Sequence, residues 1–179
     1  MLAGARDSQA FAAVVLLIGA LVGAPAAVFF WELHAGVWPF VVATSALELA
    51  YFILLAYAYD RAELSVVYPL ARGLAPVLVL AGAVAFTGAG TTPRQVGGVL
   101  LVGSGILLVR GLRRGRGALL AVVIACVIAS YTVVDKHGVA HASPVVYLEL
   151  MSIFTGLAYA GFIVATRGRG ALRERLPSA

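Results

Sequence analysis

Two apolar stretches of the sequence carry side chains that could bind a polar solute, namely Glu48, Tyr51, Tyr68 and Arg72. Glu48 lies eleven residues from either end of the stretch 37–59, which places it near the middle of a predicted membrane-spanning helix. A carboxylate at that depth costs about 2.5 to 3.5 kcal/mol on insertion scales, so it should face a cavity or a partner side chain. Thr44 and Tyr51 share its helix face, since they lie about one turn away on either side. We expect this face to present a carboxyl group and a phenol to a solute, or to hold a protonated Glu48 against a neighbouring helix.

Arg72 lies six residues inside another apolar stretch, at a depth of about 9 Å along a helix. Its guanidinium could snorkel to the lipid headgroups, or it could bind Glu48 or an anionic group of a substrate. Tyr68 lies one turn away on the same face. Pro69 and Pro76 flank Arg72, and each removes a backbone donor. We therefore expect either kinks used for packing or a broken helix of the kind found at transporter sites.

Other polar residues near the ends of apolar runs are expected to have lesser roles. Tyr131, Asp135 and Glu149 are predicted to lie at the membrane interface. His137 and His141 have the spacing of a metal-binding pair, but the glycine between them indicates a loop and no third ligand is evident. The sequence contains no glycine-rich phosphate loop, nucleophile elbow or zinc-protease motif. We predict no catalytic residue, metal site, cofactor or enzymatic activity.

Six apolar runs are predicted to form the helices that position these residues. About 20 apolar residues cross a bilayer core, and short polar segments between such runs are typical of consecutive spanning helices. Residues 92–95 (TPRQ) predict a capping box at the start of the fourth helix, and the Ser-Pro pair at 143–144 opens the sixth. The predicted spans are Ala10 to Trp31, Val37 to Tyr59, Val66 to Phe86, Pro93 to Val109, Ala118 to Val134 and Val145 to Ala165. They predict an all-α integral membrane protein.

The composition favours a lipid environment. Of 179 residues, 62% are hydrophobic and 12% are charged, and the mean hydropathy is +1.00. Soluble domains are roughly 45 to 50% apolar. The net charge of +5 could suggest a nucleic-acid partner, but the basic residues cluster at the ends of apolar runs, where lipid headgroups lie. We therefore expect the lipid bilayer, and no nucleic acid, as a partner.

The distribution of basic residues predicts the orientation of the chain. One side of the membrane collects Arg6, Arg61, Arg110, Arg113, Arg114, Arg116, Arg167, Arg169, Arg173 and Arg175. The other side collects Arg94 and Lys136. Because short cytoplasmic loops carry the excess of Lys and Arg, the first side should be cytoplasmic. Both ends of the chain are then expected in the cytoplasm, and the expected location is the cell membrane.

Small residues predict where helices pack closely. They are Gly19, Gly23 and Ala27 in the first span and Gly98 and Gly105 in the fourth. We expect these residues to serve packing rather than substrate binding. Residues 8–30 and 143–165 also share a faint pattern of serine, aromatic and small residues. As the first and sixth spans they should cross the membrane in opposite directions, as an inverted repeat requires.

Several motifs resemble a known family. Tyr57-Ala58-Tyr59, residues 64–76 (LSVVYPLARGLAP) and residues 95–101 (QVGGVLL) together resemble the end of an EamA-type repeat of the drug/metabolite transporter superfamily. Residues 128–138 (IASYTVVDKHG) resemble the opening of a second such repeat. The resemblance implies that residues 1–114 form most of the first repeat, without its first helix. Residues 115–179 would then form the first two helices of the second repeat.

The family pattern is two five-helix inverted repeats, ten helices in total, with a solute pathway between them. This chain would correspond to helices two to seven. The resemblance implies transport of small organic solutes, metabolites or drugs, by alternating access, with the four residues named first as the substrate site. The alternative is a non-transporting membrane subunit, or a truncated remnant, that needs a partner chain. A second chain or a homodimer is therefore an expected partner.

Overall fold

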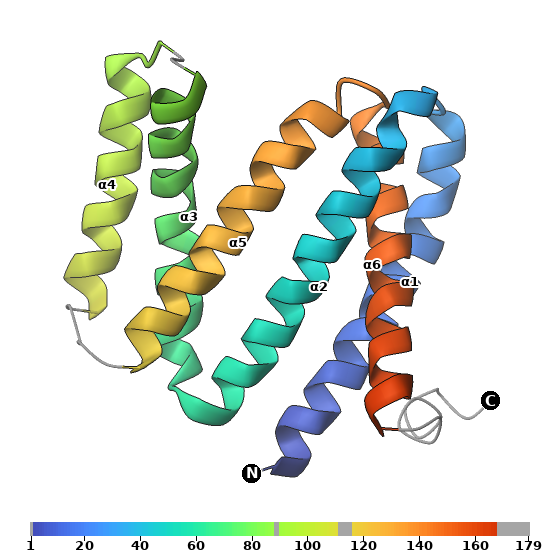
Figure 1. Ribbon diagram of the computed structural model, residues 1–179, viewed down its shortest axis with the longest axis horizontal. Coiled ribbons are helices and arrows are strands. Elements are labelled where there is room, and N and C mark those ends of the chain that lie inside the picture. Colours follow the sequence, from blue (N-terminus) through green and yellow to red (C-terminus); the bar gives the residue numbers. More distant parts are fainter. Residues whose placement is uncertain (1, 88–89, 111–115, 168–179) are drawn as a thin grey trace. The chain divides into compact units, whose positions relative to one another are not determined.

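The computed structural model describes residues 2–87, 90–110 and 116–167, and the regular structure of these residues is almost entirely helical (Figure 1). A short 3-10 helix, η1 (Ala35–Val37), precedes the second α-helix. The α-helices are α1 (Leu2–Phe29), α2 (Trp38–Arg61), α3 (Leu64–Thr87), α4 (Pro93–Arg110), α5 (Arg116–Gly138) and α6 (Pro144–Arg167). Each predicted span falls on one of them, so the predicted all-α class is confirmed.

Four stretches of the described helices are long and apolar enough to cross a membrane. They are Ala35–Ala58, Ser65–Ala85, Gly117–Gly138 and Pro144–Thr166. The apolar part of α1, Ala13–Phe29, is shorter. The chain is therefore a multi-pass helical membrane protein.

Contacts divide the chain into two compact units, which we describe separately. Unit 1 comprises Met1–Ala56 and Val134–Ala179, and unit 2 comprises Tyr57–Val133. This division concerns packing and not sequence repeats, so the predicted repeat boundary at 114/115 stays a prediction.

In unit 1, α1 packs antiparallel against α6 (Figure 1). Gly23 leaves room for the Glu149 carboxylate, and further along the pair Gly156 leaves room for Leu17. Ala13, near the middle of α1, is buried with Ile163. Along these contacts the residue numbers decrease on α1 while they increase on α6. The two helices therefore run in opposite directions. This confirms the expected opposite crossing of the first and sixth segments.

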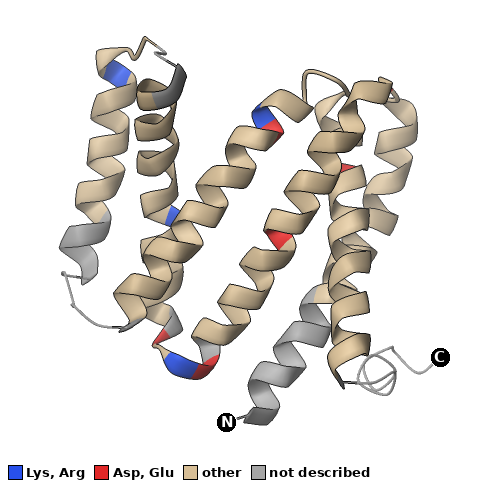
Figure 2. Cartoon of the chain, in the orientation of Figure 1, with Lys and Arg blue, Asp and Glu red and all other residues tan. Residues whose placement is uncertain are grey.

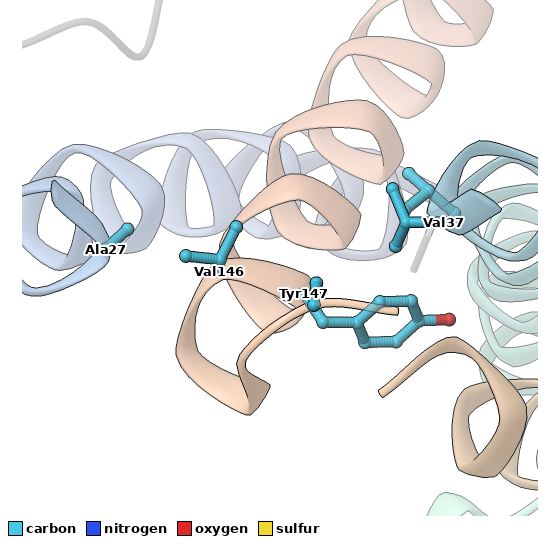
Figure 3. Packing of buried hydrophobic residues seen from close by; sticks show 6 residues of the cluster. Ala27, Val37, Val146 and Tyr147 are labelled. Carbon is cyan, nitrogen blue, oxygen red and sulfur yellow. The ribbon is translucent and has the colours of Figure 1, made fainter. Parts of the chain in front are cut away.

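A buried cluster closes the end of unit 1 where α1 finishes and α6 begins (Figure 3). It contains Ala27, Val37, Val41, Ala142, Val146 and Tyr147. Tyr147 belongs to this cluster, and it is 3% exposed. Of the three small residues predicted to serve packing on α1, Gly23 and Ala27 do so. Gly19 does not, since no described atom lies within 4 Å of the position its Cβ would take.

Hydrogen bonds tie two connecting segments together at the same end of unit 1. The amide of His34 donates to the carbonyl of His141 at 2.9 Å, and the amide of Ser143 donates to the carbonyl of Glu32 at 2.9 Å. The Ser143 hydroxyl donates to the carbonyl of Phe30 at 2.7 Å. These bonds join the α1–α2 connection to the α5–α6 connection. We call this set of contacts the connector tie.

Ser143→Ala should weaken the connector tie. Its hydroxyl also accepts a bond from the amide of Val146 at 3.3 Å, which makes it the predicted N-cap of α6. Loss of an N-cap costs about 1 kcal/mol, and we expect a fall of that size in the free energy of unfolding, measured by denaturant titration in detergent. The control is Ser152→Ala, because Ser152 donates only within α6, to Leu148 at 2.8 Å. Equal stability of the two variants would contradict the assigned role of Ser143.

In unit 2, α3 packs against α4 (Figure 1). The predicted capping box is confirmed, because the Thr92 amide donates to Gln95 Oε1 at 2.9 Å and the Gln95 amide donates to Thr92 Oγ1 at 3.3 Å. Helix α3 continues through Pro69 and Pro76, so the possibility of a broken helix there is wrong. An α-helix can retain its course past proline when the lost bond is compensated nearby.

The predicted close approach at the glycines of α4 is also wrong. No described atom lies within 4 Å of where a Cβ of Gly98 or Gly105 would be. These positions therefore adjoin open space rather than a packed helix. Gly103, between them, is the glycine of α4 that contacts α3, through Val77 at 3.7 Å.

Candidate functional site

Glu48 lies midway along α2, whereas most charged positions lie near helix ends (Figure 2). Its Oε2 accepts a hydrogen bond from the Thr155 hydroxyl of α6 at 2.8 Å. Thr155 is fully buried and Glu48 is partly buried. Of the two surroundings expected for this carboxyl group, a cavity or a partner side chain, the structure shows a partner.

The helix pair α2 and α6 positions Glu48 by a regular series of contacts in unit 1. Thr44 meets Tyr147, Glu48 meets Thr155, and the ring of Phe52 stacks on that of Tyr159 with centroids 5.2 Å apart. Along these contacts the residue numbers increase on both helices, so α2 and α6 run in the same direction. The contacts on α2 follow a four-residue spacing, which places them on one face.

Tyr51 also lies on α2, and it is 6% exposed. Its ring packs edge-on against Phe52, with centroids 5.2 Å apart. Glu48 and Tyr51 both belong to unit 1. The sequence predicted that they lie close together, because they are three residues apart on one helix.

A second polar cluster lies on the same face of α2. The Thr44 hydroxyl donates to Asp135 Oδ1 at 2.6 Å, and the Tyr147 hydroxyl donates to the same oxygen at 2.9 Å. The two hydroxyl oxygens are 3.0 Å apart. Three helices therefore meet at one carboxylate oxygen, and we call Thr44, Asp135 and Tyr147 the triad.

The triad is a feature that sequence reasoning missed. Asp135 lies near the end of α5, as expected for an interfacial residue, but it is partly buried and accepts two bonds from buried hydroxyls. Tyr147, Thr155 and Tyr159 lie on one face of α6 at intervals of eight and four residues. That regular polar spacing was the available signal.

Glu149 contacts another helix of unit 1, and its predicted place at the membrane interface stays a prediction. Its side chain is partly buried in the α1–α6 contact beside Gly23, and its Oε1 is buried without a hydrogen-bond partner among the described residues. Ser45 Oγ on α2 is likewise buried without such a partner. Unit 1 therefore holds polar atoms at which water or a solute could bind.

Tyr68 and Arg72 lie on α3 in unit 2. The guanidinium carbon of Arg72 is 5.3 Å from the centre of the Tyr68 ring, which confirms that the two share a face. Both side chains are exposed in the chain. Because Glu48 belongs to the other unit, the pairing of Glu48 with Arg72 stays a prediction.

The histidines lie together near the connector tie. Phe40 stacks on His141 at 5.3 Å and lies nearly parallel to His137 at 6.4 Å. His137 belongs to α5 and not to a loop, since the helix extends through Gly138. Among the described residues, no group of three or more His, Cys, Asp or Glu is arranged to hold a metal ion.

No protein-family model, curated protein or solved structure matches this chain. What the site can do therefore follows from its own geometry. Carboxyl groups bonded to hydroxyls inside apolar helices can exchange a proton, and they can bind a polar solute by replacing one hydrogen-bond partner with another.

Proposed function

We propose that this protein is a membrane transporter of small organic solutes, metabolites or drugs, that works by alternating access. The observation that carries the proposal is the Glu48–Thr155 bond within the apolar stretches of α2 and α6. An ionisable residue at membrane depth is expensive and usually marks a substrate or ion pathway. The chemistry proposed is binding and proton exchange, and the solute is not chemically altered.

The motif resemblance supports placing the chain in the EamA-type drug/metabolite transporters. The antiparallel pairing of α1 with α6 is compatible with the inverted repeats of such proteins. In this proposal Glu48, Tyr51, Tyr68 and Arg72 contact the solute, and a second copy or another chain completes the pathway.

Flux through reconstituted protein tests the proposal. The chain is incorporated into liposomes, and exchange of a panel of labelled amines, amino acids and organic acids is measured against protein-free liposomes. Solute movement that saturates with concentration is expected. If the chain alone gives no flux but co-purifies with a membrane partner that restores it, the alternative role as a subunit is correct. Absence of flux in both preparations would contradict transport.

We also propose that the chain lies in the cell membrane with both ends in the cytoplasm, from its arginine distribution. In a Cys126→Ala background, Gly115→Cys should resist an impermeant thiol reagent in intact cells, because it lies among the loop arginines. Thr91→Cys, between α3 and α4, should be labelled. The reverse pattern would invert the orientation.

A further inference from the structure

A cavity of about 640 Å³ lies within unit 2, among α3, α4 and α5. Its volume falls within the roughly 300 to 1,000 Å³ of small-molecule sites. Gly98 lines the cavity, and no described atom lies within 4 Å of the position that a Cβ on this residue would take. The cavity does not include Glu48 or the triad.

The walls of the cavity are apolar along most of their length. They are formed mainly by Ala75, Val79, Leu80, Ala83, Val99 and Ile128. Arg72 and Ala83 are eleven residues apart on α3, so the lining extends about 16 Å along the helix. This elongated apolar surface suits a hydrocarbon or aromatic body.

Cationic groups lie at both ends of the cavity. Arg72 lies at one end, toward the start of α3, and Arg94 lies in the first turn of α4, near the α3–α4 connection. Gln95, Tyr131 and Thr132 add polar groups to the lining. The described lining residues include no aspartate or glutamate. The charged side chains of the described lining are therefore both positive, which favours an anion.

Arg72 is the better of the two arginines to hold an acidic group. It lies eight residues from the start of α3, about 12 Å along the helix, inside an apolar stretch. A guanidinium can grip a carboxylate or phosphate with two parallel bonds, and neutralising it lowers the cost of a charge in the membrane. Arg94 lies at the helix end, where it can attract anions toward the cavity.

We propose that this cavity binds an amphipathic anion, with its acidic group at Arg72 and its apolar body along α3, α4 and α5. The source is a free organic acid or an anionic membrane lipid, which share this chemistry. The inference rests on the proposed function only in treating the bound anion as cargo, held at a position that shares Arg72 with the proposed solute contacts. Binding itself can be measured without transport.

The test uses the full chain in nanodiscs of zwitterionic phosphatidylcholine, with decanoate as the probe. Binding is measured by isothermal titration calorimetry, with empty nanodiscs as the background for partitioning. Decanoate should bind, while decanol and decyltrimethylammonium should bind at least tenfold more weakly, since loss of a charged hydrogen bond is worth about a factor of ten or more. Equal binding of decanoate and decanol would overturn the proposal.

Two variants locate the site. Arg72→Gln should weaken decanoate binding about tenfold, whereas Arg61→Gln should leave it unchanged. Arg61 is the matched control because its guanidinium carbon also lies over a tyrosine ring, 3.9 Å from the centre of Tyr57, but it does not line the cavity. Unchanged affinity in Arg72→Gln would overturn the proposal.

A third variant fills the cavity without removing a charge. Gly98→Leu should abolish binding. Gly98 lines the cavity and no described atom lies within 4 Å of the position of its Cβ, so the leucine side chain would fill the cavity. Gly97→Leu is the control, since its Cβ is also unobstructed but the residue does not line the cavity. Binding by Gly98→Leu equal to that by Gly97→Leu would contradict the location.

Nanodiscs that contain phosphatidylglycerol distinguish the two sources. If this lipid displaces decanoate from the wild type and is retained in an Arg72-dependent way by native mass spectrometry, the occupant is a membrane lipid. If decanoate binds unchanged, the occupant is a free organic acid. Both results support the amphipathic anion site. Binding without flux would contradict the proposed transport alone, whereas flux without decanoate binding would contradict this inference alone.

Discussion

Glu48→Gln should abolish uptake driven by a proton gradient, whereas exchange of the solute without a gradient should continue, because glutamine can still hydrogen-bond the solute. Glutamine keeps the size of the side chain and can still accept the bond that Thr155 donates at 2.8 Å, so the α2–α6 contact should persist. It cannot ionise, and therefore it cannot carry a proton as water enters and leaves during alternating access. The measurement is accumulation of a transported solute in liposomes with and without a pH gradient.

Two further variants separate a coupling role from simple helix packing. Thr155→Val removes the hydrogen bond but retains the carboxyl group, so coupling should survive, with an altered pH dependence. Glu63→Gln removes an exposed carboxyl group beside α3 and should change nothing. If Glu48→Gln accumulates solute like the wild type, Glu48 is an interhelical hydrogen-bonding residue only.

Gly138→Ala should cause the largest loss of stability among single methyl additions to unit 1. The added Cβ would overlap the ring and hydroxyl of Tyr147. This ring is 3% exposed and its hydroxyl donates to Asp135, so the ring has little freedom to move. Overpacking costs about 1 to 3 kcal/mol, and each interhelical bond lost in a membrane adds about 0.6 kcal/mol. Thermal unfolding in detergent measures the result.

The matched control is Gly161→Ala on α6, where no described atom lies within 4 Å of the new Cβ. It should leave stability unchanged or raise it by about 0.5 to 1 kcal/mol, because alanine favours the helix. A second comparison places Gly138→Ala in a Tyr147→Ala background, where the overlap is gone. An equal loss in both backgrounds would show that the Tyr147 contact is not the cause.

The sequence was sufficient to predict the helices because their signals are local. Apolar runs of membrane length gave the spans, and Thr92 with Gln95 gave the start of α4 through a capping box that the structure contains. The shared face of Thr44 and Glu48 followed from helical spacing alone. The depth of Glu48 also predicted a cavity or a partner side chain, but the identity of the partner, Thr155, did not follow from the sequence.

The remaining features depend on contacts between distant parts of the chain. Thr44 and Asp135 are 91 positions apart, and nothing in either segment specifies their pairing. The cavity beside Arg72 could not be predicted from the sequence either, because glycines at helical spacing are compatible with close helix packing and with open space. Gly98 was assigned to packing and instead adjoins open space. Only the positions of neighbouring helices decide between these outcomes.

The connector tie has a mechanical consequence for unit 1. Backbone bonds of 2.9 Å between residues 32–34 and 141–143 hold one end of the α1–α6 pair closed. Two helices that are held together at one end can separate only toward the other end, so the connector tie would act as a hinge. We expect any widening between α1 and α6 to grow with distance from Ser143 and to be greatest near Ala13 and Ile163. Pairs of spin labels at successive turns of α1 and α6 would measure this change in distance.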